Sequence, residues 1–546
     1  EWDAQAQRRD IEYRTRLLVR AMGGFGAAQG WWFSGRRAAL IDITSWLTHP
    51  DPARPLLAVT AGPGSGKTAV LGLIATLTHP ERRVTVPLDS LGLPAAAIPA
   101  PGTVDVVIYA QNLTTDQVLH GITAAAHVHA DKVGELLDGL TGRTAPLTVL
   151  VDALNEAADP DQLTRHLLRL LAEHANGRLR LLVGTRPHLL ANLGLRREDS
   201  IDLDAPRYAD LDALTTYATC GLLDALPDSL YQRQPPPTIH AIARAVAEAS
   251  NPSFLVARIT SSTLAADPAI PDPRDPTWRA TLPRLPGQAM RHDLETRLGD
   301  QAARVRDLLR PLAYAQGQGL PWEDIWAPLA SRIAGVTYTD DDLLWLRHHA
   351  GSYVVEATEA NRSAYRLYHQ ALAEHLRDDT DDTAIHHAFT HVLRSRVPLN
   401  SDGSRDWTRA HPYTLRHLAT HAAHCGLLDD LITDTDYLVY AEPDELLIEL
   451  HTVATDDGRL TCAIYRASAA VHRHLPPLRR RHVLATDAAR FAATHHHRTL
   501  AAPLPWPPRW ATGQQANSAL HTTLTGHDSV TAVACTTLDG QPVAVT

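Results

Sequence analysis

The chain has 546 residues, of which 44% are hydrophobic, and a formal net charge of −10. A chain of this length is too long for one core, so we expect roughly three to five globular units. The acidic balance argues against nucleic-acid binding, because DNA-binding modules normally carry a basic face and no basic run is longer than Arg479–Arg481.

Cysteine usage and hydropathy bear on the compartment. The four cysteines are widely spaced and form no Cys-x-x-Cys pair, which is typical of a reducing environment. No apolar run approaches the roughly 20 residues that span a bilayer, and no signal-peptide pattern is present. We therefore expect a cytoplasmic protein without a membrane segment. Because the first residue is Glu1 rather than methionine, we also expect a missing upstream segment.

The first half of the chain alternates between helical and strand patterns. Residues 1–30 predict a helix followed by a glycine-rich linker, and residues 38–47 predict an amphipathic helix. Four short apolar runs then follow, at residues 56–60, 104–109, 147–151 and 179–183. Their near-continuous apolarity predicts parallel strands covered on both faces, and hence an α/β domain.

Beyond residue 204 the strand signals become rare. Ala-, Leu- and Arg-rich helical patterns continue to about residue 500, and we interpret the proline clusters between them as subdomain boundaries. After a proline-rich spacer, the stretch Leu524–His527 and the Asp539-Gly540 turn are typical of the opening of a WD-type repeat. A propeller blade takes roughly 40 residues, so we expect the chain to end inside one incomplete blade.

The segment Ala61–Thr68, with the sequence AGPGSGKT, carries the strongest chemical signal. It lies between an expected strand and an expected helix, and its lysine is one of only two in the chain. A compact ammonium is needed at this place, because a guanidinium is too broad to reach between two phosphates inside a backbone loop. The pattern predicts a nucleotide site built from Gly62, Gly64, Ser65, Gly66, Lys67 and Ala69, with Thr68 as a magnesium ligand.

The departure at Ala61, where the motif usually has glycine, is tolerable if this residue has an ordinary backbone conformation. Asp152 ends a hydrophobic strand, where such sites hold Mg²⁺. Glu156, or alternatively Asn155, would orient the attacking water. Arg186 follows the next strand end and is a candidate sensor of the γ-phosphate.

These motifs, in this order and followed by helices, resemble the STAND class of signalling ATPases, with the NACHT and apoptosome-type branches nearest. Three further segments extend the resemblance. Phe33–Arg36 is similar to the segment that lies against the adenine, which implies a role for Arg36. Asn251–Leu255 is similar to the motif whose proline, here Pro252, packs on the base. Tyr365–Leu376 is similar to the winged-helix segment whose histidine, here His369, touches the β-phosphate of ADP.

The resemblance implies a multidomain α/β and α fold. A P-loop NTPase domain with a parallel sheet is followed by helical and winged-helix subdomains and by the first strands of a β-propeller. The expected boundaries are 1–30 for a helix and linker, 31–205 for the nucleotide domain, 206–280 for a helical subdomain, 281–378 for the winged helix, 379–515 for a second helical region and linker, and 519–546 for the partial blade.

The implied function is an oligomerising switch, off with ADP and on with ATP, in bacterial immune or death-related sensing. The implied partners are copies of the chain in a ring or filament, an upstream effector domain, and an unknown ligand sensed by a propeller that is mostly missing. One departure affects hydrolysis: NACHT members commonly carry an acidic residue at the place of Asn155, and an amide cannot accept a proton from water. We therefore expect a slow ATPase.

Two alternatives remain open. A scaffold that holds ADP permanently would also tolerate Asn155. A STAND-type transcription regulator would need a basic recognition helix, and none is apparent in residues 379–546. Among the 30 histidines, His417, His421 and His424 share a helical face with Cys425, which we interpret as a solvated face rather than a metal site, and His495–His497 as a surface run.

Overall fold

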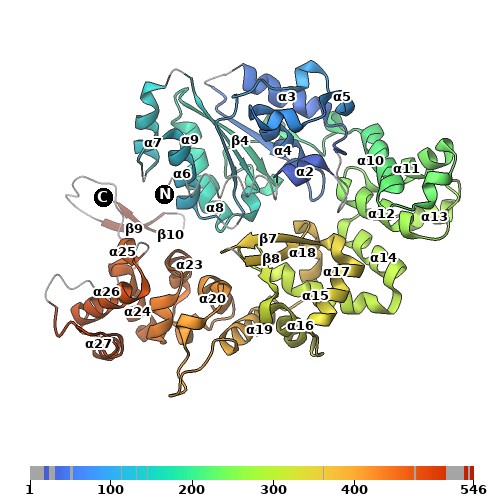
Figure 1. The fold of residues 1–546 in the computed structure, drawn as a ribbon. Coiled ribbons are helices and arrows are strands. Elements are labelled where there is room, and N and C mark those ends of the chain that lie inside the picture. The colour runs from blue at the N-terminus through green and yellow to red at the C-terminus, as the bar shows by residue number, and fades with distance from the viewer. Residues whose placement is uncertain are drawn as a thin grey trace. The chain divides into compact units, whose positions relative to one another are not determined.

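The computed structural model describes residues 17–23, 31–49, 53–111, 113–130, 132–143, 145–360, 362–472, 475–511, 534–538 and 541–545. The chain divides into two compact units, Glu1–Thr380 and Asp381–Thr546. In Figure 1 the first unit carries the elements coloured from blue to yellow.

A five-stranded parallel sheet forms the centre of the first unit, in the order β2-β3-β4-β1-β5. Its strands are β1 (Leu56–Thr60), β2 (Val106–Tyr109), β3 (Leu147–Asp152), β4 (Leu179–Thr185) and β5 (Ile201–Asp202). The four apolar runs of the sequence are therefore strands, and the predicted parallel sheet is confirmed. The fifth strand was not predicted, because two residues carry no periodicity.

Helices cover both faces of this sheet (Figure 1). One apolar core lies between the strands and α6 (Thr115–Ala126), α7 (Val133–Gly139) and α9 (Arg169–Glu173). The other core lies between the strands and α3 (Arg37–Thr48) and α4 (Lys67–Thr78), and it includes residues of the short helix α2 (Val19–Met22). Burial on both faces explains why the strands read as continuous apolar runs.

A group of helices follows the sheet. It comprises α10 (Leu211–Asp224), α11 (Pro236–Ser250), α12 (Phe254–Ala266) and α13 (Pro276–Thr281), and the first three share one apolar core. Proline at the first turn suits the starts of α11 and α13, since the missing N–H has no intrahelical partner there. The peptide bond between Asn251 and Pro252, just before α12, is cis.

The next part, residues 286–377, is called the α14–α18 unit here. Its helices are α14 (Pro286–Leu298), α15 (Ala302–Tyr314), α16 (Ala327–Ala334), α17 (Asp340–Ala350) and α18 (Gln370–Arg377). An antiparallel sheet joins β6 (Leu320–Pro321), β8 (Arg362–Leu367) and β7 (Val354–Glu359) in that order. These strands were not predicted, because charged and half-buried residues interrupt their apolar pattern.

The second unit is mainly helical. Its helices are α19 (Asp382–Ser395), α20 (Pro412–His424), α21 (Leu428–Ile432), α22 (Thr435–Tyr440), α23 (Pro443–Glu449), α24 (Asp456–Ala467), α25 (Ala469–His472), α26 (Pro477–Arg490) and α27 (Thr494–Ala501). Near the end of the chain β9 (Ala534–Leu538) pairs with β10 (Gln541–Val545) in an antiparallel ladder. The WD-type stretch Leu524–His527 and the turn at 539–540 lie outside the described residues.

The histidines of this unit correct two interpretations of the sequence. The α20 face is solvated only at its end, where His424 is exposed. His417 and His421 are buried, and the ring of His421 stacks on Phe389 with centroids 4.2 Å apart. The histidines 495–497 are also not all on the surface, since His496 is buried and its Nε2 lies 2.7 Å from the hydroxyl of Thr461. Within the described ranges, no group of three or more His, Cys, Asp or Glu side chains is arranged to hold a metal ion.

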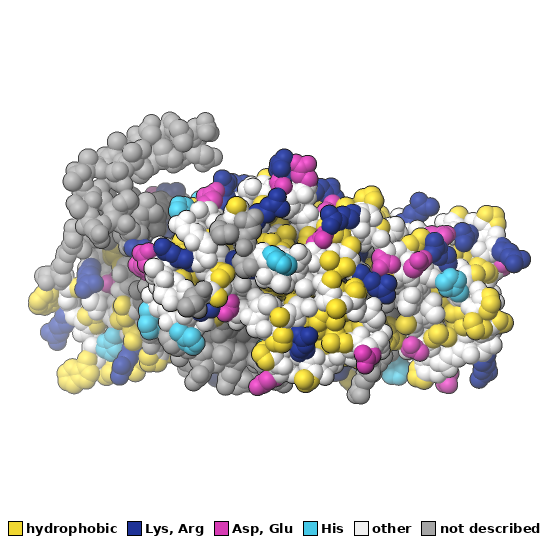
Figure 2. Space-filling view, turned by 90° about the horizontal axis from the view of Figure 1, so that it is seen from above, with side chains coloured by type: hydrophobic (Ala, Val, Ile, Leu, Met, Phe, Trp, Pro, Cys, Tyr) yellow, Lys and Arg dark blue, Asp and Glu magenta, His cyan; other side chains and the backbone are white. Residues whose placement is uncertain are grey.

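The described residues also bear on membrane insertion and on the distribution of surface charge. None of the helices they form is both long and apolar enough to cross a membrane. On the face shown in Figure 2, basic and acidic side chains are intermixed rather than gathered by sign.

Candidate functional site

The loop between β1 and α4 has the backbone geometry of an anion cradle. Gly64 and Gly66 have φ values of +79° and +91°, and Gly66 caps the N-terminus of α4. Positive φ at such glycines turns successive N–H groups into a concavity that suits phosphate. The N–H of Gly62 donates to Asp204 Oδ2 at 2.6 Å, which anchors the start of the loop. Ala61 is not among the residues with positive φ, so alanine fits where the motif usually has glycine.

The Lys67 ammonium folds back over this loop. Its Nζ donates to the carbonyl oxygens of Ala61 at 2.9 Å and Gly62 at 3.4 Å. Burial lowers the pKa of Lys67 below its ordinary value, and nearby Asp152 opposes the shift. A cation held at low solvation beside backbone donors favours an anionic ligand.

Asp152, at the end of β3, is buried on the floor of the site. Burial raises the pKa of its carboxyl group, and hydrogen bonds from the Thr68 hydroxyl and the Ala153 N–H oppose the rise. Within the described part of the chain, its Oδ2 has no hydrogen-bond partner. A Cβ at Gly184 would overlap Oδ1, so glycine at this place in β4 makes room for the carboxylate. An orphaned carboxylate oxygen beside a hydroxyl is a donor set that fits a hard cation such as Mg²⁺.

Two candidates for handling water follow Asp152. Asn155 and Glu156 lie in a short 3₁₀ turn, Leu154–Glu156, and both line the pocket. Glu156 Oε2 accepts a hydrogen bond from the Tyr109 hydroxyl at 3.4 Å. The structure therefore places a carboxylate, and not only the amide of Asn155, at the pocket wall.

Arg186 directly follows β4 and also lines the pocket. Its Nη2 donates to Glu374 Oε1 in α18 at 2.6 Å. The side chains of Arg186 and Glu374 are 20% and 38% exposed, respectively. This ion pair ties the α/β domain to the α14–α18 unit at the edge of the pocket.

Arg36 is buried and binds backbone carbonyls. Nη1 donates to Leu203 at 2.7 Å and to Tyr208 at 2.9 Å, while Nη2 donates to Ser65 at 2.7 Å and to Pro252 at 3.4 Å. Burial lowers the pKa of Arg36 to about 10. The guanidinium thus clamps the phosphate loop to the chain that leads into α12.

His369 reaches the pocket from the N-terminus of α18. Its Nδ1 accepts the N–H of Ala371 at 3.1 Å, so the proton of the neutral ring lies on Nε2. Burial lowers the pKa of His369 well below its ordinary value, and the cations Arg20 and Lys67 add to the shift. The ring is therefore a neutral N–H donor at pH 7.

The residues predicted from the sequence fall into two groups. Those that line the pocket are Arg36, Gly64, Ser65, Gly66, Lys67, Thr68, Ala69, Asp152, Asn155, Glu156, Arg186 and His369. Gly62 and Pro252 lie beside it without being among the lining residues, and Pro252 contributes its carbonyl to Arg36. Phe254, two residues further on, lines the pocket with its ring 5.3 Å from that of Tyr217.

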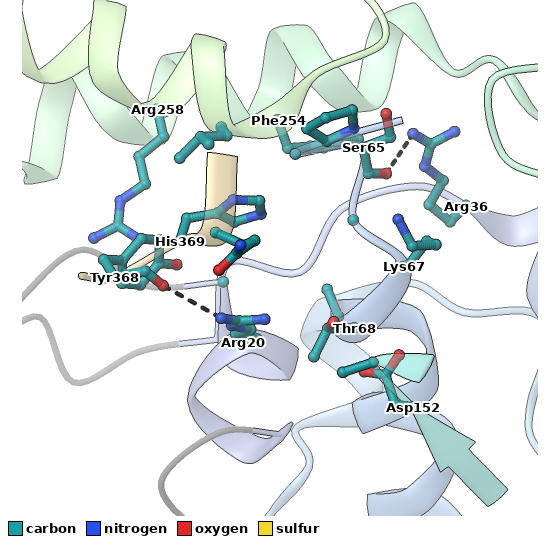
Figure 3. Close-up of a pocket in the computed structure, with 18 of the residues that line it drawn as sticks. Arg20, Arg36, Ser65, Lys67, Thr68, Asp152, Phe254, Arg258, Tyr368 and His369 are labelled. Atoms are coloured by element: carbon teal, nitrogen blue, oxygen red, sulfur yellow. Dashed lines mark hydrogen bonds between the residues drawn. The ribbon is translucent and has the colours of Figure 1, made fainter. Parts of the chain in front are cut away.

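Sequence reasoning missed several neighbours of the site. Arg20 and Tyr368 line the pocket in Figure 3, and Asp204 holds the loop through Gly62. Tyr368 stands next to His369 in the sequence, which was a usable signal. Arg20 precedes the phosphate loop by a long stretch of chain, so no motif spacing could connect the two.

The comparisons with known proteins add little to this geometry. No protein-family model and no curated protein matches the chain. Among solved structures, Cdc6p from Pyrobaculum aerophilum is 14% identical, with a TM-score of 0.28 over 65% of this chain and 93% of that one. The Orc1 protein of Aeropyrum pernix, in complex with DNA, is 16% identical, with a TM-score of 0.27 over 64% and 93%. A mutant RuvB of Thermotoga maritima is 13% identical, with a TM-score of 0.24 over 64% and 97%.

TM-scores this low carry no argument about function. The fold rests instead on the chain's own features, namely the parallel order β2-β3-β4-β1-β5 and a glycine loop that joins β1 to the N-terminus of α4. The α/β domain has a P-loop NTPase fold. Helical regions follow it along the chain.

Proposed function

We propose that the chain is a nucleotide-controlled switch that binds ATP or ADP with Mg²⁺ in the pocket around Lys67. One observation carries the proposal, which is that two parts of the first unit build the pocket together. Lys67, Asp152 and Arg186 come from the α/β domain, and His369 comes from the α14–α18 unit. Loss or gain of the terminal phosphate would therefore change contacts in both the α/β domain and the α14–α18 unit.

The side chains fit a magnesium nucleotide. The amides around Gly64 and Gly66 and the Lys67 ammonium would hold the phosphates, since all of them are donors that lie at the start of α4. Thr68 and Asp152 would hold Mg²⁺, whose charge offsets that of the phosphates. Gly62 and Ser65 act on the loop itself, through Asp204 and Arg36.

The α14–α18 unit, which we interpret as the winged helix, would close the site in the ADP state. Nε2 of His369 would donate to a phosphate oxygen, because Nδ1 is already used by the N–H of Ala371. The Arg186–Glu374 pair would hold the same closed arrangement, with Arg186 released to the γ-phosphate when ATP replaces ADP. Phe254 and Pro252, at the start of α12, would lie on the base side.

Hydrolysis would be slow. Glu156 is the carboxylate available to orient water, and its oxygen is engaged by Tyr109. Asn155 is an amide and cannot act as a base. We therefore propose a timer-like ATPase rather than a rapid motor.

The wider role rests on the motif order of the STAND class. Closure would cover surfaces that contact neighbouring copies, and ligand recognition by a C-terminal propeller would allow exchange for ATP and assembly into a ring or filament. Assembly would cluster an N-terminal effector in a cytoplasmic sensor of bacterial-immune or death-related type. Asn155 favours one second candidate, a scaffold that holds ADP without turnover.

The test compares nucleotide binding and particle mass in matched lysine variants. Fluorescent ADP is titrated into wild type, Lys67→Ala and Lys132→Ala, the last being the exposed and only other lysine. We expect binding to be lost only in Lys67→Ala, and light scattering of the wild type to show larger particles with a non-hydrolysable ATP analogue than with ADP. Equal binding by wild type and Lys67→Ala would contradict nucleotide control, and equal mass in both nucleotides would favour the scaffold.

A further inference from the structure

The short helix α2 is packed tightly on the helix that follows the phosphate loop. Leu17 and Ala21 are buried, and a Cβ added at Gly72 of α4 would lie 2.5 Å from the carbonyl oxygen of Leu17. The C-terminal end of α2 is held as well, because the Tyr217 hydroxyl donates to the carbonyl of Gly23 at 2.9 Å. A segment upstream of the motifs is therefore built into the wall of the pocket.

In Figure 3 the side chain of Arg20 lies between those of Tyr368 and Thr68, and Asp152 is among the charged groups that act on it. Its Nη2 donates to the carbonyl of Tyr368 at 3.3 Å, next to His369. Its Nη1 donates to the Tyr109 hydroxyl at 3.3 Å, and this hydroxyl donates to Glu156 Oε2 at 3.4 Å. One guanidinium thus links the start of α18 to the carboxylate that would orient water.

Charge holds Arg20 in this place. Burial is the largest influence and lowers the pKa of its guanidinium, but Tyr109, Glu156, Tyr368 and Asp152 together raise the pKa overall. Of these four groups, the carboxylates of Glu156 and Asp152 are the ones that can carry negative charge at pH 7. Tyr368 is also held from the other side, because the Arg258 guanidinium lies 3.8 Å from the centroid of its ring. Tyr368 is therefore in contact with two cations, Arg20 at its carbonyl oxygen and Arg258 at its ring.

We infer that Arg20 senses the terminal phosphate of the nucleotide and passes its presence to the Tyr368–His369 segment, an inference that rests on the proposed function. A guanidinium binds a phosphate more strongly than it binds a neutral carbonyl. A terminal phosphate near Thr68 and Asp152 would therefore draw Arg20 away from Tyr368. The start of α18 would lose a contact when ATP replaces ADP, and α2 would be coupled to the same event.

A purely structural role makes a different prediction. If Arg20 only supports the fold, its loss weakens ADP and ATP binding by the same factor. If it senses the terminal phosphate, its loss weakens ATP binding more, since only ATP supplies that group. The ratio of the two dissociation constants therefore separates the two roles.

The experiment measures Kd for ADP and for a non-hydrolysable ATP analogue in wild type, Arg20→Met and Arg20→Lys. Arg20→Met should raise the ratio of the analogue Kd to the ADP Kd by about tenfold, the effect of one lost charged hydrogen bond. Arg20→Lys should restore most of the ratio, because an ammonium still binds phosphate. Arg37→Met, which changes an exposed arginine of α3, is the matched control.

A second variant tests the position of Arg20 without altering it. Gly72→Ala should displace α2, because the new Cβ would meet the carbonyl of Leu17. It should therefore also raise the ratio of the analogue Kd to the ADP Kd. This variant replaces Arg20→Met in the experiment if Arg20→Met does not fold. A ratio within about twofold of wild type in Arg20→Met, or in Gly72→Ala in its place, overturns the inference. Wild type that binds neither nucleotide would instead contradict the proposed function, so the two failures are distinguishable.

Discussion

The ion pair between Arg186 and Glu374 gives the sharpest quantitative prediction about closure. Glu374→Gln keeps the shape of the side chain and removes its charge, and it does not alter any residue of the phosphate loop. A fully buried charged hydrogen bond contributes roughly 1.5–3 kcal/mol. Because Glu374 is 38% exposed and Arg186 is 20% exposed, solvent screening reduces the expected contribution to about 1 kcal/mol.

That energy should appear in the release of ADP. If the pair holds the closed state, losing about 1 kcal/mol should speed ADP dissociation about fivefold. Stopped-flow displacement of fluorescent ADP measures this rate for wild type, Glu374→Gln, Arg186→Gln and the double variant. The double variant should be no faster than the faster single variant, because each change removes the same interaction.

A distant ion pair provides the control. Glu173→Gln disrupts the exposed pair between Arg169 and Glu173 on α9 and should leave ADP release unchanged. Release at the wild-type rate from Glu374→Gln would refute the idea that this pair holds the closed state. A double variant whose effect is the sum of two sizeable single effects would refute it as well.

Three further predictions concern other parts of the chain. Gly184→Ala should displace the Asp152 carboxylate, because the new Cβ would overlap it. In calorimetry, the variant should need a higher Mg²⁺ concentration to bind ATP. Its Kd for ADP without Mg²⁺ should stay within about threefold of the wild-type value. Gly64→Ala should weaken binding of both nucleotides at least tenfold in the same titration, because φ is +79° there and the new Cβ would lie 2.7 Å from Leu255 Cβ. Burial holds the pKa of His421 well below its ordinary value. At a pH below about 6.5, the unfolded chain therefore binds a proton at this residue that the folded chain does not. As the pH is lowered through this range, the free energy of unfolding should decrease by up to about 1.4 kcal/mol per pH unit. Urea unfolding between pH 7.5 and pH 5 should show this slope, and an unchanged slope in His421→Gln would contradict the assignment.

The parallel sheet was predictable because its physics is local and strong. Strands buried on both faces are apolar throughout, and this pattern placed Leu56–Thr60 at its observed bounds. The glycines and lysine of the loop after β1 were predictable for a similar reason, since few residue types satisfy a backbone that turns around phosphate. In both cases one short segment contains the information.

The missed features depend on partners that are distant in the sequence. Arg20 and Tyr368 are separated by 348 positions in the sequence and meet only through the fold, and neither residue belongs to a spacing pattern. The solvation of α20 was misjudged because a polar helix face gives no sign of the α19 residues, such as Phe389 and His386, that cover His421. The β7–β8 hairpin was missed because its faces are only partly buried.

The most direct test of the switch is the nucleotide that the purified protein carries. The protein is denatured and the released nucleotide is identified by chromatography, with Lys67→Ala prepared in parallel. A closed resting state predicts one ADP per wild-type chain and none in Lys67→Ala. Wild-type protein that releases no nucleotide and also fails to bind added ATP would contradict it.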